Sequence, residues 1–262
     1  MPSICSTVSI LLLIILIMIT LESLKDRIGI VMVSELLGTS LLVVTFSLTG
    51  PMDVLVNAIM YFLCVLLCYQ TSCAQLNPAI TFALYIREGK YKENHQPMAL
   101  IITAQLIGAF LGLELALLLR VVHGPNGQQI EPPMYGHLPG IQSEVGDNQW
   151  LTVALIDAIG CALFTVFYLR TLEKCEDFVW AAFALGLVYY AAVWLVFQTT
   201  SSLFNPAIAV SVGFENMWNF TFMGEKSDQL WKWFWVAWLV GPFIGSACAI
   251  PALDAYQKQI KS

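Results

Sequence analysis

The strings QLNPAI at residues 75–80 and LFNPAI at residues 203–208 decide the fold of this chain. Both contain Asn-Pro-Ala-Ile (an NPA box), and their asparagines, Asn77 and Asn205, are 128 positions apart. Asparagine and proline are unfavourable inside a helix, because asparagine bonds to the nearby backbone and proline lacks an N–H group. Each string therefore predicts the start of a helix, with asparagine as the N-cap and proline in the first turn.

The composition places the chain in a lipid bilayer. Of its 262 residues, 58% are hydrophobic and only 11% are charged, and the mean hydropathy is +0.74. A soluble domain carries about 25% charged residues, so this chain has too few to cover a surface that faces water. Six apolar segments are long enough to cross the hydrocarbon core, near residues 29–49, 53–71, 97–121, 150–170, 178–198 and 230–252. The sequence therefore predicts an all-α integral membrane protein.

A further apolar run precedes these six segments, at residues 9–21. It is shorter than a span, and it lacks the basic start and the small-residue cleavage site of a signal peptide. We expect it to remain in the protein as an extra helix or membrane anchor that lies on or partly in the bilayer. A full additional span is the alternative.

The positive charges orient the six spans. With the N-terminal region inside, nine of the twelve lysines and arginines fall on one side, which the positive-inside rule assigns to the cytoplasm or its organellar equivalent. The long segment 122–149 contains neither lysine nor arginine and is predicted to lie outside. The first NPA box then enters from the inner side and the second from the outer side.

Each NPA box precedes an apolar stretch that is too short to cross the membrane, at residues 78–86 and at residues 206–214. These stretches predict two half-helices that dip into the bilayer from opposite sides. Three spans and a half-helix, repeated with the opposite orientation, mark a substrate path near the midplane. The two helix N-termini would meet there, and their positive dipole ends and asparagine amides would repel cations.

These elements divide the chain into two inverted repeats and three flanking segments. The repeats are 29–121, with the NPA box 77–79, and 150–252, with the NPA box 205–207. The flanking segments are the apolar N-terminal segment 1–28, the connecting outer loop 122–149 and the C-terminal tail 253–262.

Four further fragments, taken with the two boxes, resemble the aquaporin (major intrinsic protein) superfamily. They are SELLGTSLLVV at 34–44, AQLIGAFLG at 104–112, LIDAIGCALFTV at 155–166 and LVGPFIGSACA at 239–249, which resemble the family's first, third, fourth and sixth spans. Each fragment is weak alone, but their order and spacing are highly specific, and the resemblance covers about residues 30–252. It implies an aquaporin-like inverted repeat of six transmembrane helices with two re-entrant NPA half-helices. It also implies a homotetramer with one pore in each subunit, which passes water or small neutral solutes without a cofactor.

The resemblance further implies which residues form the pore. The two boxes supply Asn77, Pro78, Ala79, Asn205, Pro206 and Ala207, and the selectivity-filter positions fall at Asn57, Val193, Ser202 and Ile208. The family normally has arginine where this chain has Ile208, and that change removes a fixed charge and five hydrogen-bond donors. Two interpretations stay open: a less polar constriction that passes ammonia, hydrogen peroxide or glycerol with water, or an apolar constriction that stays dry and closed. The sequence also leaves open which bulky neighbours enter the lumen, among Tyr189, Tyr190, Trp194 and Phe204.

Glu35 in the first predicted span and Asp157 in the fourth lie at equivalent points of the two repeats. Charged groups at that depth usually face the interior of the bundle, so we expect both acids to brace the re-entrant loops by accepting hydrogen bonds. Asp157 stands where the family normally has glutamate. Cys73, four residues before Asn77, occupies a place where the family often has glycine, and we interpret its thiol as a site for thiol reagents at the inner vestibule.

The leading hypothesis is a passive channel for water, small neutral solutes, or both, in contact with membrane lipids. The alternative is a transport-inactive structural subunit of a larger membrane complex. Four features suit it: the missing arginine, the apolar N-terminal run, Glu114 and the tryptophan-rich stretch 231–235.

The three histidines lie in separate loops, and no nucleotide-binding or hydrolase motif is present, so no metal, cofactor or enzymatic activity is expected. No basic cluster indicates a nucleic-acid partner. The sequence leaves both the plasma membrane and an organelle membrane open.

Overall fold

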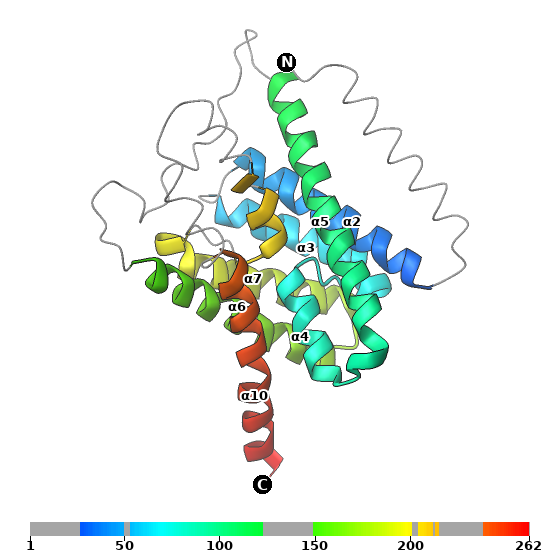
Figure 1. Cartoon of the computed structure of the whole chain (residues 1–262), viewed down its shortest axis with the longest axis vertical. Helices are drawn as coiled ribbons and strands as arrows, with labels where there is room; N and C mark the ends of the chain where they lie inside the picture. The colour runs from blue at the N-terminus through cyan, green and yellow to red at the C-terminus, as the bar shows by residue number, and fades with distance from the viewer. Residues whose placement is uncertain are drawn as a thin grey trace.

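The structure is a computed structural model that describes residues 27–49, 53–122, 149–200, 204–211, 213–214 and 238–261. Its helices are α2 (Arg27–Thr49), α3 (Val54–Ser72), α4 (Pro78–Glu88), α5 (Tyr91–Val122), α6 (Gln149–Lys174), α7 (Phe178–Thr200) and α10 (Gly241–Lys261) (Figure 1). Six of the described helices are long and apolar enough to cross a membrane, which confirms the predicted all-α, six-span fold. The predicted anchor at 9–21, the interior of the outer loop 122–149 and the stretch 231–235 lie outside the described residues.

Two spans differ in length from the sequence prediction. Helix α5 begins at Tyr91 rather than at 97, with Pro97 inside it, because one proline in a long packed helix removes only one backbone hydrogen bond. Helix α10 continues past the predicted end at 252 to Lys261, although Pro251 lies within it. It therefore includes most of the segment that was expected to form a tail. In Figure 1 its last turns extend beyond the rest of the bundle.

The helices pack in a pattern that repeats between the two halves of the chain. In the first half, α2 packs against α3 and α5, and in the second half, α6 packs in the same way against α7 and α10. Helices α3 and α7, the middle spans of the two halves, pack against each other and join them. The short helix α4 contacts α5 of its own half and α10 of the other. The first half-helix is therefore held by both halves of the chain.

Glycines let two helices in each half approach closely. Gly108 on α5 lies so near the backbone carbonyl of Leu36 on α2 that a Cβ atom would collide with it. Gly245 on α10 lies in the same way against the carbonyl of Ala158 on α6. A second glycine one turn away on each helix makes a further close contact with the facing backbone. Small residues spaced in this way are a common device for packing helices in membranes, and here both halves use it.

The outer surface of the bundle is apolar, whereas several polar side chains are buried inside it. Leu55, Leu67 and Trp194 are each more than half exposed. The buried polar side chains include Glu35, Gln105, Asn77 and Asn205. A surface of this kind suits contact with lipid tails, which are as apolar as leucine. The polar groups that can act on a solute therefore lie in the interior.

Glu173 of α6 links three helices at the end of the bundle where α4 finishes. Its carboxylate forms an ion pair with Arg87 of α4 and accepts hydrogen bonds of 2.9 and 3.2 Å from the amide of Gln257 of α10. Arg170, one turn earlier on α6, donates to the same carboxylate at 3.1 Å. Partly exposed ion pairs contribute only about 0–1 kcal/mol to stability. The cluster therefore serves mainly to position the end of the half-helix.

Candidate functional site

The first half-helix begins at the first NPA box. Asn77 has an extended backbone, and its side-chain oxygen accepts a hydrogen bond of 2.8 Å from the N–H group of Ala79. Pro78 follows as the first helical residue, where its missing N–H group costs nothing. The helix ends at Gly89, which takes the left-handed conformation (φ 68°) that favours glycine. The local sequence therefore accounts for both ends of α4.

The second box has the same local structure. The side-chain oxygen of Asn205 accepts a hydrogen bond of 3.0 Å from the N–H group of Ala207, and helical backbone follows at once. The backbone carbonyl of Asn205 accepts a hydrogen bond of 2.9 Å from the N–H group of Ala209. Asn77 makes the corresponding backbone bond in the first box. Each half of the chain thus contains a helix start with an asparagine cap.

The two boxes meet, and each asparagine reaches across to the other. The amide nitrogen of Asn77 donates a hydrogen bond of 3.2 Å to the backbone carbonyl of Phe204, and the amide nitrogen of Asn205 donates one of 2.8 Å to that of Leu76. Phe204 and Leu76 are the residues that immediately precede the two asparagines. Both asparagines are buried, at 2% and 3% exposure. Two helix N-termini, each with a partial positive charge, therefore lie together in the interior.

The loop before the first box has an unusual backbone. Cys73, Ala74 and Leu76 have positive φ angles of 61°, 51° and 51°, although none of them is glycine. A side chain in the left-handed region costs roughly 1–3 kcal/mol and persists only where the surroundings hold it. Such outliers are concentrated at functional sites. The loop therefore needs partners elsewhere in the fold.

Glu35 of α2 is the main partner of this loop. One oxygen of its carboxylate accepts a hydrogen bond of 2.9 Å from the N–H group of Gln75, and the other accepts one of 2.6 Å from that of Leu76. The amide of Gln105 on α5 donates to the second oxygen at 2.7 Å and to the hydroxyl of Thr81 at 2.9 Å. Glu35 and Gln105 are both completely buried. A single network therefore joins α2, α5, the strained loop and the half-helix.

The second half provides one more contact to this loop. The hydroxyl of Tyr168 on α6 donates a hydrogen bond of 2.7 Å to the backbone carbonyl of Cys73. Asp157, one of the two predicted bracing acids, is completely buried on α6. The loop residues 201–203, which include Ser202 and which Asp157 was expected to brace, lie outside the described residues.

The structure places three of the four predicted filter positions, and all three are buried. Asn57, at 5% exposure, donates its amide to the backbone carbonyl of Asp53 at 3.1 Å. Val193, at 3% exposure, belongs to the same hydrophobic cluster as Tyr61. Ile208, at 2% exposure, belongs to a second cluster that contains Phe46. Val193 and Ile208 therefore lie in different apolar clusters.

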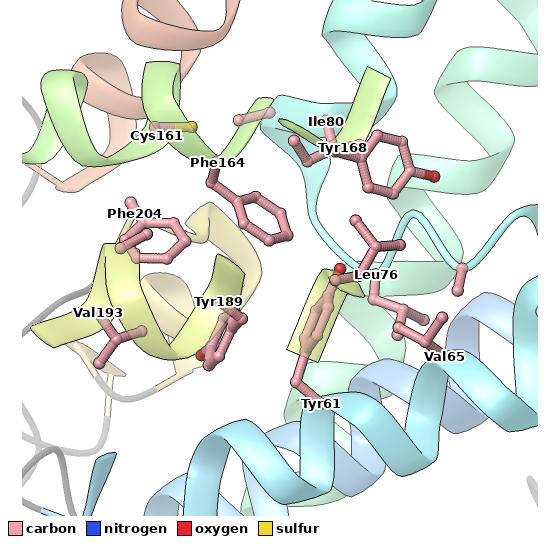
Figure 2. Close-up of a cluster of buried hydrophobic side chains, with 14 of the residues drawn as sticks. Tyr61, Val65, Leu76, Ile80, Cys161, Phe164, Tyr168, Tyr189, Val193 and Phe204 are labelled. Carbon is pink, nitrogen blue, oxygen red and sulfur yellow. The ribbon is translucent and has the colours of Figure 1, made fainter. Parts of the chain in front are cut away.

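A group of aromatic side chains fills the centre of the bundle beside the boxes (Figure 2). Tyr61 of α3 and Tyr189 of α7 stack on each other, and Phe164 of α6 and Phe204 pack around them. Of the four bulky residues that the sequence left open, Tyr189 and Phe204 are buried in this group. Tyr190 and Trp194 are exposed and stack on each other, with centroids 6.4 Å apart.

Sequence reasoning missed three polar partners and one aromatic residue of this region. They are Gln105, Thr81, Tyr168 and Tyr61. Tyr61 carried a usable signal, because it lies 128 positions before Tyr189, which is also the spacing of the two boxes. The three polar residues carried no such signal in the sequence, since buried polar side chains can be recognised only once their hydrogen-bond partners are placed.

Comparison with known proteins agrees with this architecture. The sequence matches the family Major intrinsic protein over residues 31–252. Its fold is similar to the X-ray structure of the aquaglyceroporin from Plasmodium falciparum, with a TM-score of 0.63 and 18% sequence identity over 86% of this chain and 98% of that chain. No curated protein matches the chain. The chain belongs to the major intrinsic protein (aquaporin) family, whose members are multi-pass membrane channels and not enzymes.

Proposed function

We propose that this protein is a passive channel for water and small neutral solutes, with one path through each subunit of a homotetramer. The path passes the point where the two NPA boxes meet. The observation that carries the proposal is the reciprocal bonding of Asn77 and Asn205, which fixes two amide donors at the ends of two half-helices. The repeats 29–121 and 150–252 each supply one half of this centre.

The chemistry of the centre favours neutral solutes that accept hydrogen bonds. Each asparagine amide carries two hydrogens, and the described structure engages one of them in the crossing bond. The second hydrogen of each amide is the donor that we assign to the passing molecule. The half-helix N-termini add partial positive charge, so cations and hydrated protons are repelled. No energy source or cofactor is required for such passage.

The solute range follows from the filter positions. Ile208 and Val193 provide no hydrogen-bond donors, and Asn57 already bonds to its own helix. A filter with so few donors replaces less of a solute's hydration than one with arginine. We therefore propose that ammonia, hydrogen peroxide or glycerol passes as well as water.

Liposome permeability tests the proposal. Purified protein is reconstituted, and vesicle shrinkage under an impermeant osmolyte is followed by stopped-flow light scattering, with empty vesicles beside it. We expect shrinkage well above that of empty vesicles and no increase in proton flux. Asn205→Ala should lower water permeability about tenfold, the equivalent of one lost hydrogen bond to the passing molecule. Asn94→Ala, which removes an exposed amide that bonds to Glu88, is the matched control and should have no effect.

Two results would count against a channel. Permeability equal to that of empty vesicles, with folding confirmed by circular dichroism, would favour the alternative of a structural subunit in a larger membrane complex. Recovery of the native protein only in such a complex, rather than as a free tetramer, would support that alternative independently.

A further inference from the structure

Two tyrosines from the two halves of the chain stack in the interior. The rings of Tyr61 on α3 and Tyr189 on α7 are parallel within 1°, and their centroids are 4.5 Å apart (Figure 2). The side chains are only 1% and 4% exposed. Each tyrosine stands sixteen residues before the asparagine of its own half, Asn77 or Asn205. The pair therefore occupies equivalent places in the two inverted repeats.

The tyrosine pair lies beside the meeting point of the two boxes. Phe204, whose backbone carbonyl accepts the amide of Asn77, has its ring centroid 5.7 Å from that of Tyr189. Phe164 packs edge-on against Tyr61 and Tyr189, with centroid distances of 5.5 and 5.9 Å. These are contact distances for aromatic rings, so no water molecule fits between them. Four aromatic rings thus close the bundle next to the asparagine amides.

The hydroxyl group of Tyr61 is buried and has no hydrogen-bond partner among the described residues. Tyr168, a comparable buried tyrosine, does donate its hydroxyl hydrogen, to the carbonyl of Cys73 at 2.7 Å. Buried hydroxyls are normally paired, because an unpaired one has lost its hydration without replacement. In Figure 2 the Tyr61 oxygen points toward Leu76, the residue before Asn77. The hydroxyl therefore lies at the edge of the site where the boxes meet.

We propose that Tyr61 and Tyr189 form a second constriction, about one helical turn from the filter positions Asn57 and Val193, that limits which solutes pass, and that the Tyr61 hydroxyl binds the passing solute. This inference rests on the proposed channel function and deepens it. The stacked rings block the path until they separate, and two aromatic rings offer too few oxygen ligands to replace the hydration shell of an ion. A small uncharged molecule with one or two hydrogen-bonding groups gains a bond to the Tyr61 hydroxyl as the rings separate.

The test removes the stack and compares permeabilities. The proteins are the wild type, Tyr61→Leu, Tyr189→Leu and the double variant, with Tyr190→Leu as the control. Tyr190 is the neighbour of Tyr189 in sequence, but it is 37% exposed and stacks on Trp194 instead. Water and glycerol permeability are measured in liposomes at equal protein content. The single variants keep the test valid if the double variant does not fold.

We expect each single variant to raise glycerol permeability and the double variant to raise it at least about fivefold, since the rings no longer block the path. The Tyr190→Leu protein should match the wild type. If the wild type conducts and the double variant is no faster, the constriction proposal is overturned while the channel function stands. If only the stack variants conduct, the constriction is supported and the wild type is not an open channel. If neither conducts, both proposals fail.

The role of the hydroxyl is tested separately with Tyr61→Phe. This variant keeps the ring and the stack and removes only the unpaired oxygen. We expect it to lower the permeability of glycerol and water about two- to fivefold, because the passing solute loses a hydrogen bond. Tyr190→Phe, which removes an exposed hydroxyl, should change neither. Unchanged or increased permeability in Tyr61→Phe would overturn the binding role, whereas the steric role is decided by the leucine variants.

Discussion

One oxygen of the Glu35 carboxylate lies 2.6 Å from the backbone nitrogen of Leu76, a residue whose φ angle is 51°. A carboxylate on α2 thus holds Leu76, whose backbone has the left-handed conformation, directly before Asn77 of the first NPA box. Leu76 in turn offers its carbonyl to the amide of Asn205. The position of the second asparagine therefore depends, through one residue, on an acid in the other half of the chain.

Replacing this acid by its amide should disturb the loop. Glu35→Gln keeps the size of the side chain, but it puts an NH2 group either against the N–H group of Gln75 or against the N–H group of Leu76 and the amide of Gln105. An unmatched buried donor costs about 1–3 kcal/mol, so we expect a comparable loss of unfolding free energy. Unfolding by SDS titration in mixed micelles measures it. Glu114→Gln, at an exposed place on α5, is the control and should be neutral.

The asparagines should contribute to stability as well as to passage. Asn205→Ala removes the cap on Ala207 and the crossing bond to Leu76. Loss of an N-cap costs about 1 kcal/mol, and loss of a hydrogen bond costs about as much again. We expect a decrease of about 2 kcal/mol in the free energy of unfolding. A neutral result would show that the two half-helices do not depend on each other.

Placing an arginine at the proposed filter position Ile208 should destabilise the fold. Ile208 is 2% exposed and belongs to an apolar cluster with Val43, Phe46 and Trp238. An arginine there would bury its charge without a carboxylate partner in the cluster, which costs several kcal/mol. We expect Ile208→Arg to lower the yield of folded, monodisperse protein in detergent, measured by size-exclusion chromatography, while Ile208→Val elutes as the wild type. Full recovery of Ile208→Arg would indicate that the side chain can turn toward the pore.

Cys73 should react slowly with thiol reagents at neutral pH. Cys73 is exposed, but desolvation by the surrounding loop and helices raises the pKa of its thiol above the ordinary value, so less of the reactive thiolate is present at pH 7. We expect maleimide labelling to be slower than that of a free thiol at pH 7 and to accelerate as the pH rises toward the raised pKa. Mass spectrometry of the labelled peptide gives the rate. If mercurials block the channel through this thiol, Cys73→Ser should abolish the block, and an unchanged block would place the sensitive thiol elsewhere.

The sequence was sufficient for the parts of the fold that rest on local signals. Length and apolarity located the six spans, and the asparagine–proline pair located the start of α4, because capping is a property of adjacent residues. The ends of α5 and α10 were less accurate, since Pro97 and Pro251 were expected to lie near helix ends and are accommodated inside.

The remaining features of the candidate site depend on contacts between distant segments. Cys73, Ala74 and Leu76 carry no local preference for positive φ, so their conformation follows only from the network around them. Gln105 lies 70 positions from Glu35, and no sequence pattern in either segment predicts the hydrogen bond between them. Periodicity reports which face of a helix is buried, but it does not report which buried groups will be paired.

The crossing of the asparagine amides also imposes an order on biosynthesis. Asn77 and the carbonyl that it bonds are 127 residues apart, so the ribosome has to complete about half of the second repeat before Asn77 can form this bond. Until then the amide nitrogen of Asn77 needs temporary partners in the bilayer, such as water or the insertion machinery. The mature centre therefore forms late, after the second box has been made, and a chain truncated before Phe204 would enter the membrane without the partner of Asn77.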